Sequence, residues 1–344
     1  MDSTIESVKE YYGKVLKSSA DLKTSACCAV EALPPLLQKA AAQIHPEVRE
    51  RFYGCGAPFP AELRGATVLD LGCGTGRDCY LLSQLVGESG KVIGVDMTPS
   101  QLEIARRHEV YHQEKFGYAR SNVQFLEGYI EDLKSLGIED SSVDVVVSNC
   151  VLNLSPDKRR VFSELLRVLK PGGELFISDV FSLQRLPESF KKDPVLLGEC
   201  LGGALYTEDF RRLLIDLGVN DYRIVNRSRI DLVNESVKAK AGAYEFYSIT
   251  VRAFKLDLED RCEDYGQVAH YLGTIPEMPH AFRLDDHHNF ITGKRLAVCS
   301  NTAAMLSDTR YTSHFKIEGD LSRHYGLFDC GPTTTEEAAP GACC

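Results

Sequence analysis

The chain has 344 residues with a formal net charge of −10 at pH 7, and no apolar run reaches the length of a membrane-spanning helix. The acidic balance gives no electrostatic support for binding nucleic acid or an anionic membrane. The first residues lack the basic stretch and apolar core of a signal peptide, so we expect a cytoplasmic protein. In a reducing cytoplasm the 12 cysteines are reactive thiols, ligands for a soft ion or buried structural thiols, and not a disulfide framework.

The first 60 residues carry cysteines but no strand pattern. Apolar side chains recur at helical spacing over residues 4–17, which predicts an amphipathic helix that closes over a ligand or packs on the surface. We therefore treat residues 1–60 as an N-terminal, helical segment that bears Cys27, Cys28 and Cys55.

From residue 61 to 253, short apolar strands alternate with helices. Strands are expected at 67–71, 91–95, 123–126, 143–148 and 175–178. Helices are expected at 77–86, 99–115, from 155 to 170 and at 208–217. This alternation predicts an α/β fold with a doubly wound, mostly parallel sheet, ended by an antiparallel pair at 222–226 and 245–252. An inserted segment at about 185–206 interrupts the pattern.

The βα alternation stops at about residue 254, where histidines, cysteines and turn residues become more frequent. Residues 254–330 are predicted to form a small C-terminal α+β domain. Residues 331–344, rich in Thr, Glu, Ala and Pro, are expected to be a flexible tail that ends in Cys343 and Cys344.

A glycine-rich stretch organises the predicted sheet. Residues 68–78 read VLDLGCGTGRD, so a strand is followed by a turn with Gly72, Cys73, Gly74 and Gly76 and then by a helix. Glycine lets such a turn bend sharply and lets the backbone approach a ligand closely. Asp70 stands at the end of the strand, where a carboxylate repels a phosphate and favours a cationic ligand that carries an amino group.

Further polar residues stand at the carboxyl ends of the other strands, which is where ligands bind in open α/β sheets. Asp96 ends the second strand and is placed to accept from ribose hydroxyls, and Met97 beside it to pack on adenine. Ile130 and Glu131 follow the third strand and are placed to contact adenine and its amino group. Asn149 follows the fourth strand and is placed to hold the amino-acid part of a cofactor.

This pattern resembles the S-adenosylmethionine site of the class I methyltransferases. The alternative cofactor is NAD, but the loop reads G-x-G-x-G in place of G-x-G-x-x-G. The turn Lys-Pro-Gly-Gly at 170–173 is also similar to the turn that precedes the fifth strand in methyltransferases.

Four cysteine motifs make the resemblance more specific, and the chain is similar to the arsenite S-adenosylmethionine methyltransferases along about residues 5–330. The motifs are Cys27 in the N-terminal segment, YGCG at 53–56 with Cys55, SNCVLNL at 148–154 with Cys150, and ECLGGA at 199–204 with Cys200. Their separations match the layout of that family. Cys28 can replace Cys27 as the N-terminal thiol, although the spacing favours Cys27.

The resemblance implies an enzyme that transfers methyl groups from S-adenosylmethionine to thiolate-bound trivalent arsenic, free or as a glutathione conjugate. Cys150 and Cys200 are the implied arsenic ligands, Cys55 is a third ligand or a redox partner, and Cys27 pairs with Cys55. Because trivalent arsenic keeps a lone pair, methyl transfer to it needs alignment and exclusion of water but no general base. A disulfide among Cys27, Cys55 and Cys150 would supply two electrons and then be reduced by thioredoxin or glutathione.

Other thiols are left without a role in this chemistry. Cys73 and Cys79 are expected to be structural, and Cys262, Cys299 and Cys330 lack the C-x-x-C spacing of a zinc site. Arsenic is then the substrate, and no metal cofactor is expected. The Cys343–Cys344 dithiol either captures trivalent arsenic for the enzyme or is incidental.

Two other functions compatible with the sequence are methylation of a small organic acceptor and arsenic sensing without catalysis. The first explains the sheet but not the four cysteine motifs, and the second does not explain an intact cofactor loop. We expect a monomer with no nucleic-acid or membrane partner.

Overall fold

The computed structural model describes residues 8, 9, 11, 35–52 and 54–330. Most of the helix expected over 4–17 lies outside these residues. So do Cys27, Cys28, Cys343 and Cys344, and the roles predicted for them therefore stay predictions.

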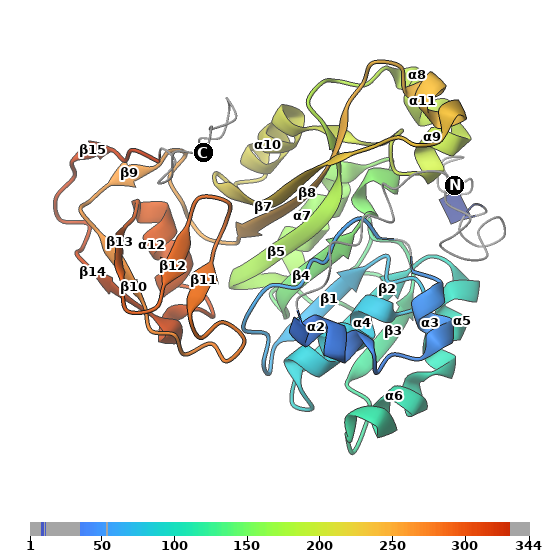
Figure 1. Cartoon of the computed structure of the whole chain (residues 1–344), viewed down its shortest axis with the longest axis horizontal. Helices are drawn as coiled ribbons and strands as arrows, with labels where there is room; N and C mark the ends of the chain where they lie inside the picture. Colours follow the sequence, from blue (N-terminus) through green and yellow to red (C-terminus); the bar gives the residue numbers. More distant parts are fainter. Residues whose placement is uncertain (1–7, 10, 12–34, 53, 331–344) are drawn as a thin grey trace.

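A sheet of eight strands forms the centre of the protein (Figure 1). Its strands are β1 (Thr67–Leu71), β2 (Lys91–Asp96), β3 (Val123–Glu127), β4 (Val143–Asn149), β5 (Leu169–Ser182), β6 (Leu205–Tyr206), β7 (Tyr222–Ile230) and β8 (Phe246–Phe254). The order is β3-β2-β1-β4-β5-β8-β7, with β6 beside β5. All neighbours are parallel except β8, which runs antiparallel to β5 and β7. The predicted doubly wound sheet with an antiparallel end is confirmed.

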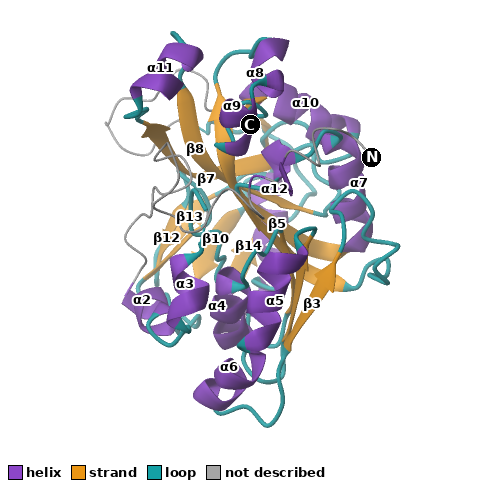
Figure 2. Cartoon of the chain, turned by 90° about the vertical axis from the view of Figure 1, so that its right-hand side faces the viewer, coloured by secondary structure: helices purple, strands orange, loops and turns teal. Residues whose placement is uncertain are grey.

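Helices cover both faces of this sheet, as its apolar strands require. The helices are α2 (Pro35–Ala41), α3 (Pro46–Glu50), α4 (Arg77–Val86), α5 (Pro99–Arg107), α6 (Glu109–Phe116), α7 (Lys158–Val168), α8 (Glu188–Lys192), α9 (Pro194–Gly198), α10 (Thr207–Asp216) and α11 (Glu235–Ala241), with the 3-10 turn η3 (Leu152–Leu154). Buried side chains of α4 and α5 form one apolar core, and those of α7 and α10 form another on the opposite face (Figure 2). Because helices cover both faces of the sheet, a site can form at the loops that follow the carboxyl ends of β1 to β5.

Two of the expected helices differ from the structure. The single helix expected over 99–115 is interrupted at His108, whose φ of −100° and ψ of 11° separate α5 from α6. The helix expected to start at Ser155 begins at Lys158, because the Asp157 side chain accepts from Arg160 N and caps it. Thr98 is the N-cap of α5, but its side chain makes no capping hydrogen bond.

The residues after β8 pack around an apolar core of their own. They form β9 (Glu263–Asp264), β10 (Val268–Tyr271), β11 (Ala281–Arg283), β12 (Asn289–Ile291), β13 (Arg295–Ala297), α12 (Ser300–Ser307), η4 (Thr312–His314), β14 (Phe315–Glu318) and β15 (Gly326–Leu327). The buried Arg252 of β8 joins this part to the sheet, because it donates both to Glu174 of β5 at 2.7 Å and to the Tyr311 hydroxyl at 2.8 Å. Among the described residues, no helix has the length and apolar character needed to cross a membrane.

Candidate active site

A cavity opens at the carboxyl ends of β1, β2 and β4, where ligands bind in open α/β sheets. Nine of the ten residues predicted to contact a cofactor line it, namely Asp70, Gly72, Cys73, Gly74, Asp96, Met97, Ile130, Glu131 and Asn149. Gly76 does not. It stands behind the loop, where an added Cβ would lie 2.8 Å from Phe125 and 3.2 Å from Ala105.

The glycine loop depends on its glycines for two different reasons. Gly72, Gly74 and Gly76 all have φ between 53° and 83°, the left-handed region in which side chains with a Cβ are strained. At Gly72 the space is closed as well, because an added Cβ would lie 2.3 Å from Cγ2 of Val151. The loop is thus pressed directly against the residue that follows Cys150.

Three carboxylates line the cavity, with Asp70 and Asp78 buried and Asp96 partly exposed. Burial raises the pKa of all three, and repulsion from Asp78 raises that of Asp70 further. Arg77, at 3.1 Å from Asp78, opposes the effect at Asp78. A cavity with this excess of acidic groups favours a ligand that carries positive charge.

Two acidic side chains of the cavity, Asp96 and Glu131, are held in place by hydrogen bonds. Asp96 accepts from the backbone of Gly74 and of Thr98, each at 2.8 Å, which orients its carboxylate at the rim of the cavity. Glu131 accepts from the Ser155 hydroxyl at 2.5 Å. Both side chains keep acceptor capacity for hydroxyl or amino groups of a ligand.

Asn149 lines the cavity, but its amide groups are used to hold the Cys55 loop. The side-chain oxygen accepts from the backbone of Cys55 at 2.9 Å and of Gly56 at 3.1 Å. The side-chain nitrogen donates to Gly56 O at 2.9 Å and to Asp78 at 3.0 Å. The sequence did not single out Asp78, although it belongs to the RD pair that ends the glycine-rich stretch.

Three of the four predicted thiols come together beside this cavity. Cys55 and Cys150 form a disulfide with their Cα atoms 5.8 Å apart, and the Cys200 thiol donates to the Cys150 carbonyl at 3.2 Å. All three are buried in one apolar cluster, and Cys150 lines the cavity itself. In this structure Cys55 is bonded to Cys150 and not to Cys27, the partner that the resemblance implied.

The backbone at two of these cysteines is strained. Cys150 has a φ of 59° and Cys200 a φ of 61°, and only two other described residues besides glycine, Glu62 and Ser141, have positive φ. Strain of this kind persists where the surrounding structure imposes it, which is frequent at functional sites. Gly203 lets the Cys200 loop come so close that an added Cβ would lie 1.9 Å from Asn153 O.

The N-terminal residues that the structure describes reach both parts of the site. Val8 lines the cavity, and the Tyr11 hydroxyl donates to Glu199, the residue before Cys200, at 2.9 Å. Of the two alternatives for the N-terminal helix, closing over a ligand or packing on the surface, these contacts are compatible with the first, which stays a prediction.

Cys73 and Cys79 have a structural environment. Burial raises the pKa of Cys73 to about 11 and the pKa of Cys79 well above its usual range, and Cys79 donates to Asp70 at 3.2 Å. Thiols that stay protonated are poor nucleophiles.

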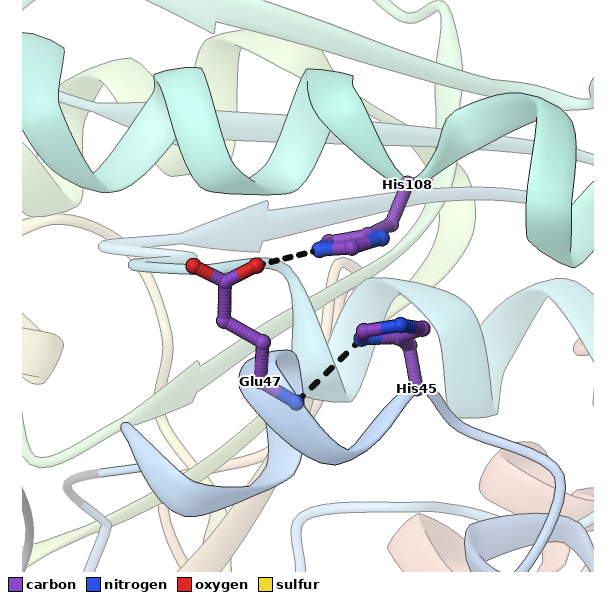
Figure 3. Close-up of side chains that lie close together, drawn as sticks. All are labelled: His45, Glu47 and His108. Carbon is purple, nitrogen blue, oxygen red and sulfur yellow. Dashed lines mark hydrogen bonds and ion pairs between the residues drawn. The ribbon is translucent and has the colours of Figure 1, made fainter.

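A group of His45, Glu47 and His108 lies outside the cavity, between α3 and the α5–α6 junction (Figure 3). The two imidazole rings are stacked with centroids 3.7 Å apart, and His108 contacts Glu47 at 2.6 Å. Stacked rings point their nitrogen lone pairs in parallel directions and not at a common ion. Arg107 also contacts Glu47, at 3.2 Å. This arrangement is an ion-paired helix contact and not a formed metal site.

The chain is similar to known methyltransferases. Residues 62–218 match the family described as a methyltransferase domain, and residues 265–344 match the arsenite methyltransferase C-terminal domain. The arsenite methyltransferase of Aquipseudomonas alcaligenes is 56% identical over 328 residues, which are 95% of this chain and 94% of that protein. This chain belongs to the arsenite methyltransferase family.

The family likeness extends to the human arsenite methyltransferase, which is 43% identical over 90% of this chain and 82% of that protein. A crystal structure from the same family, the arsenic(III) S-adenosylmethionine methyltransferase of Chlamydomonas reinhardtii, superimposes with a TM-score of 0.83 at 52% identity. It covers 87% of this chain and the whole of that one.

Proposed function

We propose that the protein methylates trivalent arsenic with S-adenosylmethionine as the methyl donor, giving monomethyl and dimethyl products. The observation that carries the proposal is the convergence of Cys55, Cys150 and Cys200 from three distant segments at the edge of one cavity. Thiolates bind soft, thiophilic ions, and trivalent arsenic is such a ligand. Family membership supports the same reaction.

The cavity fits the proposed cofactor. When bound, S-adenosylmethionine supplies an electrophilic methyl group on a positively charged sulfur. Asp70, Asp78 and Asp96 offer negative charge to a cationic ligand at the cavity that all three line. We assign Asp96 to ribose hydroxyls, Met97 and Ile130 to the adenine faces and Glu131 to the adenine amino group.

The thiols hold the arsenic next to this cavity. We assign Cys150 and Cys200 as ligands of the trivalent arsenic substrate, with Cys55 as a third ligand or as the redox partner of Cys150. The apolar cluster around them excludes water. Because the arsenic lone pair carries no proton, the protein's task is to position the substrate, and no general base is required.

Methyl transfer leaves arsenic formally pentavalent, so two electrons must return it to the trivalent state. Cys55 and Cys150 are placed to supply them, because their thiols lose two electrons and two protons when the disulfide forms. A dithiol protein of the thioredoxin class, or two glutathione molecules, would then reduce that disulfide. Cys27, which lies outside the described residues, is proposed as a relay thiol for this reduction.

The test supplies purified protein with arsenite, S-adenosylmethionine and glutathione, and separates the methylated arsenic products by species. We expect products from the wild type and none from Cys150→Ser, with S-adenosylmethionine binding retained by the variant. Retained binding separates loss of the arsenic ligand from loss of the fold. Equal product from the variant would overturn the assignment of Cys150.

If the wild type binds the cofactor but yields no methylated arsenic, the two alternative functions, methylation of a small organic acceptor and arsenic sensing, have to be tested. A small thiol or quinone acceptor would then be assayed with the same cofactor. Arsenite binding without product would indicate a sensor.

A further inference from the structure

The C-terminal part contains a second pair of thiols that the proposed reaction does not use. Cys299 is the N-cap of α12, and Cys330 follows β15, which pairs with β9 (Figure 1). Helix α12 packs against β9, and this packing brings the two cysteines within hydrogen-bonding contact. Neither is in a disulfide, whereas Cys262 nearby is disulfide-bonded.

The pair differs in accessibility. Cys299 is fully buried, while Cys330 is partly exposed and precedes the part of the chain that the structure does not describe. A ligand arriving from solvent would thus meet Cys330 first and Cys299 behind it. Two thiols in contact, one of them reachable, are the arrangement that a thiophilic ligand with two exchangeable groups needs.

The surroundings of Cys299 favour its thiolate. Its sulfur accepts from the Thr302 backbone at 3.5 Å and from the Arg223 guanidinium at 3.8 Å. The hydrogen bond with Cys330 comes first and the charge of Arg223 second in lowering the pKa of Cys299 to about 5, against the opposing effect of burial. Thiolates are the form that bonds to soft ions.

Arg223 also pairs with two carboxylates, so the Cys299 thiolate is a third buried negative charge beside one guanidinium. Asp221 accepts from Arg223 at 2.7 Å and Asp285 at 3.1 Å, and all of these groups are buried. A covalent bond from the Cys299 sulfur to an electrophile would remove the third buried negative charge and leave the two carboxylates with Arg223.

We propose that Cys299 and Cys330 form a second binding site for trivalent arsenic, separate from the crevice of Cys55, Cys150 and Cys200. In arsenous acid two As–O bonds break and two As–S bonds form. The two hydroxyl groups leave as water, one with the proton of the Cys330 thiol and the other with a proton from solvent, because Cys299 reacts as its thiolate. Arsenic stays trivalent, so no electrons are exchanged. A tetrahedral zinc site would need further ligands, and among the described residues the groups of three or more metal-ligating side chains do not include Cys299.

The test measures arsenic retained by the full-length chain in which Cys55, Cys150 and Cys200 are all replaced by serine. After incubation with arsenite and removal of free arsenic, we expect about one arsenic atom per chain. Adding Cys299→Ser or Cys330→Ser should weaken retention at least about tenfold. The matched control is Cys343→Ser with Cys344→Ser, which removes two thiols from the same end of the chain and should leave retention unchanged.

The wild type provides a second measurement that does not depend on multiple substitutions. Arsenite should protect Cys330, the partly exposed thiol of the pair, from alkylation, as read by mass spectrometry of peptides. Loss of arsenic only in the Cys343/Cys344 variant, or alkylation of Cys330 unaffected by arsenite, would overturn the proposal. Methylation by the wild type is scored separately, so failure of this site and failure of the proposed reaction are distinguishable.

Discussion

The Asn149 side chain holds Cys55 in place, since its oxygen accepts from the Cys55 backbone at 2.9 Å. Its other bonds reach Gly56 and Asp78, so one amide connects the thiol pair to the acidic wall of the cavity. Gly54 allows this contact, because an added Cβ there would lie 2.6 Å from the Asn149 nitrogen. The geometry at Cys55 and the cofactor cavity are therefore coupled through a single side chain.

We predict that Asn149→Ala lowers kcat for arsenic methylation by about 100-fold, because the Cys55 loop loses its anchor. The rate at which the Cys55–Cys150 disulfide forms should fall in parallel, an effect that a merely structural role would not produce. The matched control is Asn122→Ala, which loses comparable hydrogen bonds at Ser83 and Gly87, remote from the thiols. Both variants should lose stability, but an unchanged disulfide rate in Asn149→Ala would contradict the positioning role.

A second prediction separates the two reasons for glycine in the cofactor loop. Gly72→Ala and Gly74→Ala both force a Cβ into the left-handed region, at a cost of about 1–2 kcal/mol. Only Gly72→Ala also collides with Val151, whereas nothing lies within 4 Å of a Cβ at Gly74. Gly72→Ala should therefore reduce the free energy of unfolding of the cofactor-free protein by about 1–3 kcal/mol more than Gly74→Ala.

Val151→Ala supplies the control for this comparison. It should recover part of the stability lost in Gly72→Ala and none of that lost in Gly74→Ala, as measured by denaturant unfolding. Equal losses in the two glycine variants, with no recovery, would show that the contact with Val151 has no energetic role.

The sequence predicts most of the fold because strand ends and glycine turns are local features. The residues around Asp70, Asp96 and Glu131 reach the same cavity because parallel strands end at one edge of the sheet. The break at His108 was not predictable in this way. It accompanies contacts of His108 with His45 and Glu47, which come from a segment about 60 residues earlier in the chain.

The contacts of the side chains in the site are harder to predict from the sequence than their positions along the chain. The sequence predicts that Asn149 stands at the end of its strand, which the structure confirms. Nothing in the sequence around it indicates that its side chain bonds the backbone of Cys55. The contact between Cys299 and Cys330 depends on β9–β15 pairing, a two-residue ladder with no periodic signal in the sequence. Non-local contacts of this kind need the tertiary structure.

The acidic cavity predicts a pH dependence of cofactor binding. Burial raises the pKa of Asp70, Asp78 and Asp96, so the folded state holds protons more tightly than the unfolded chain does. The stability that the folded state gains from this tighter proton binding is complete below about pH 4, the usual pKa of Asp. It is lost as pH rises through the raised pKa values of the three carboxyl groups. A cationic ligand restores it by favouring the ionised carboxylates.

We therefore expect the stabilisation by S-adenosylmethionine, measured as a Tm shift, to grow as pH rises above about 4, the usual pKa of Asp. S-adenosylhomocysteine, which lacks the sulfonium charge, is the matched ligand and should show a smaller increase. Asp70→Asn should reduce the pH dependence for S-adenosylmethionine. The same pH dependence for both ligands would exclude the carboxylates as its source.

The buried environment of His112 predicts that the folded protein loses stability in acid. Its ring stacks on Tyr80 with centroids 3.5 Å apart, its Nε2 accepts from the His45 backbone at 3.1 Å, and its Nδ1 contacts the His108 carbonyl at 2.7 Å. The neutral ring with its proton on Nδ1, assigned from these partners, satisfies both contacts. A second proton on Nε2 would face the His45 N–H, and burial lowers the pKa of His112 to about 4.

Because the folded pKa of His112 lies below that of an unfolded histidine, its contribution to stability is complete above about pH 6.5 and is lost as pH falls toward 4. We expect it to account for about 2–3 kcal/mol of the free energy of unfolding across that range. Denaturant unfolding at a series of pH values should show a shallower decline in His112→Gln. The exposed His280, replaced in the same way, should leave the decline as in the wild type, and an equal change in both variants would exclude His112 as its cause.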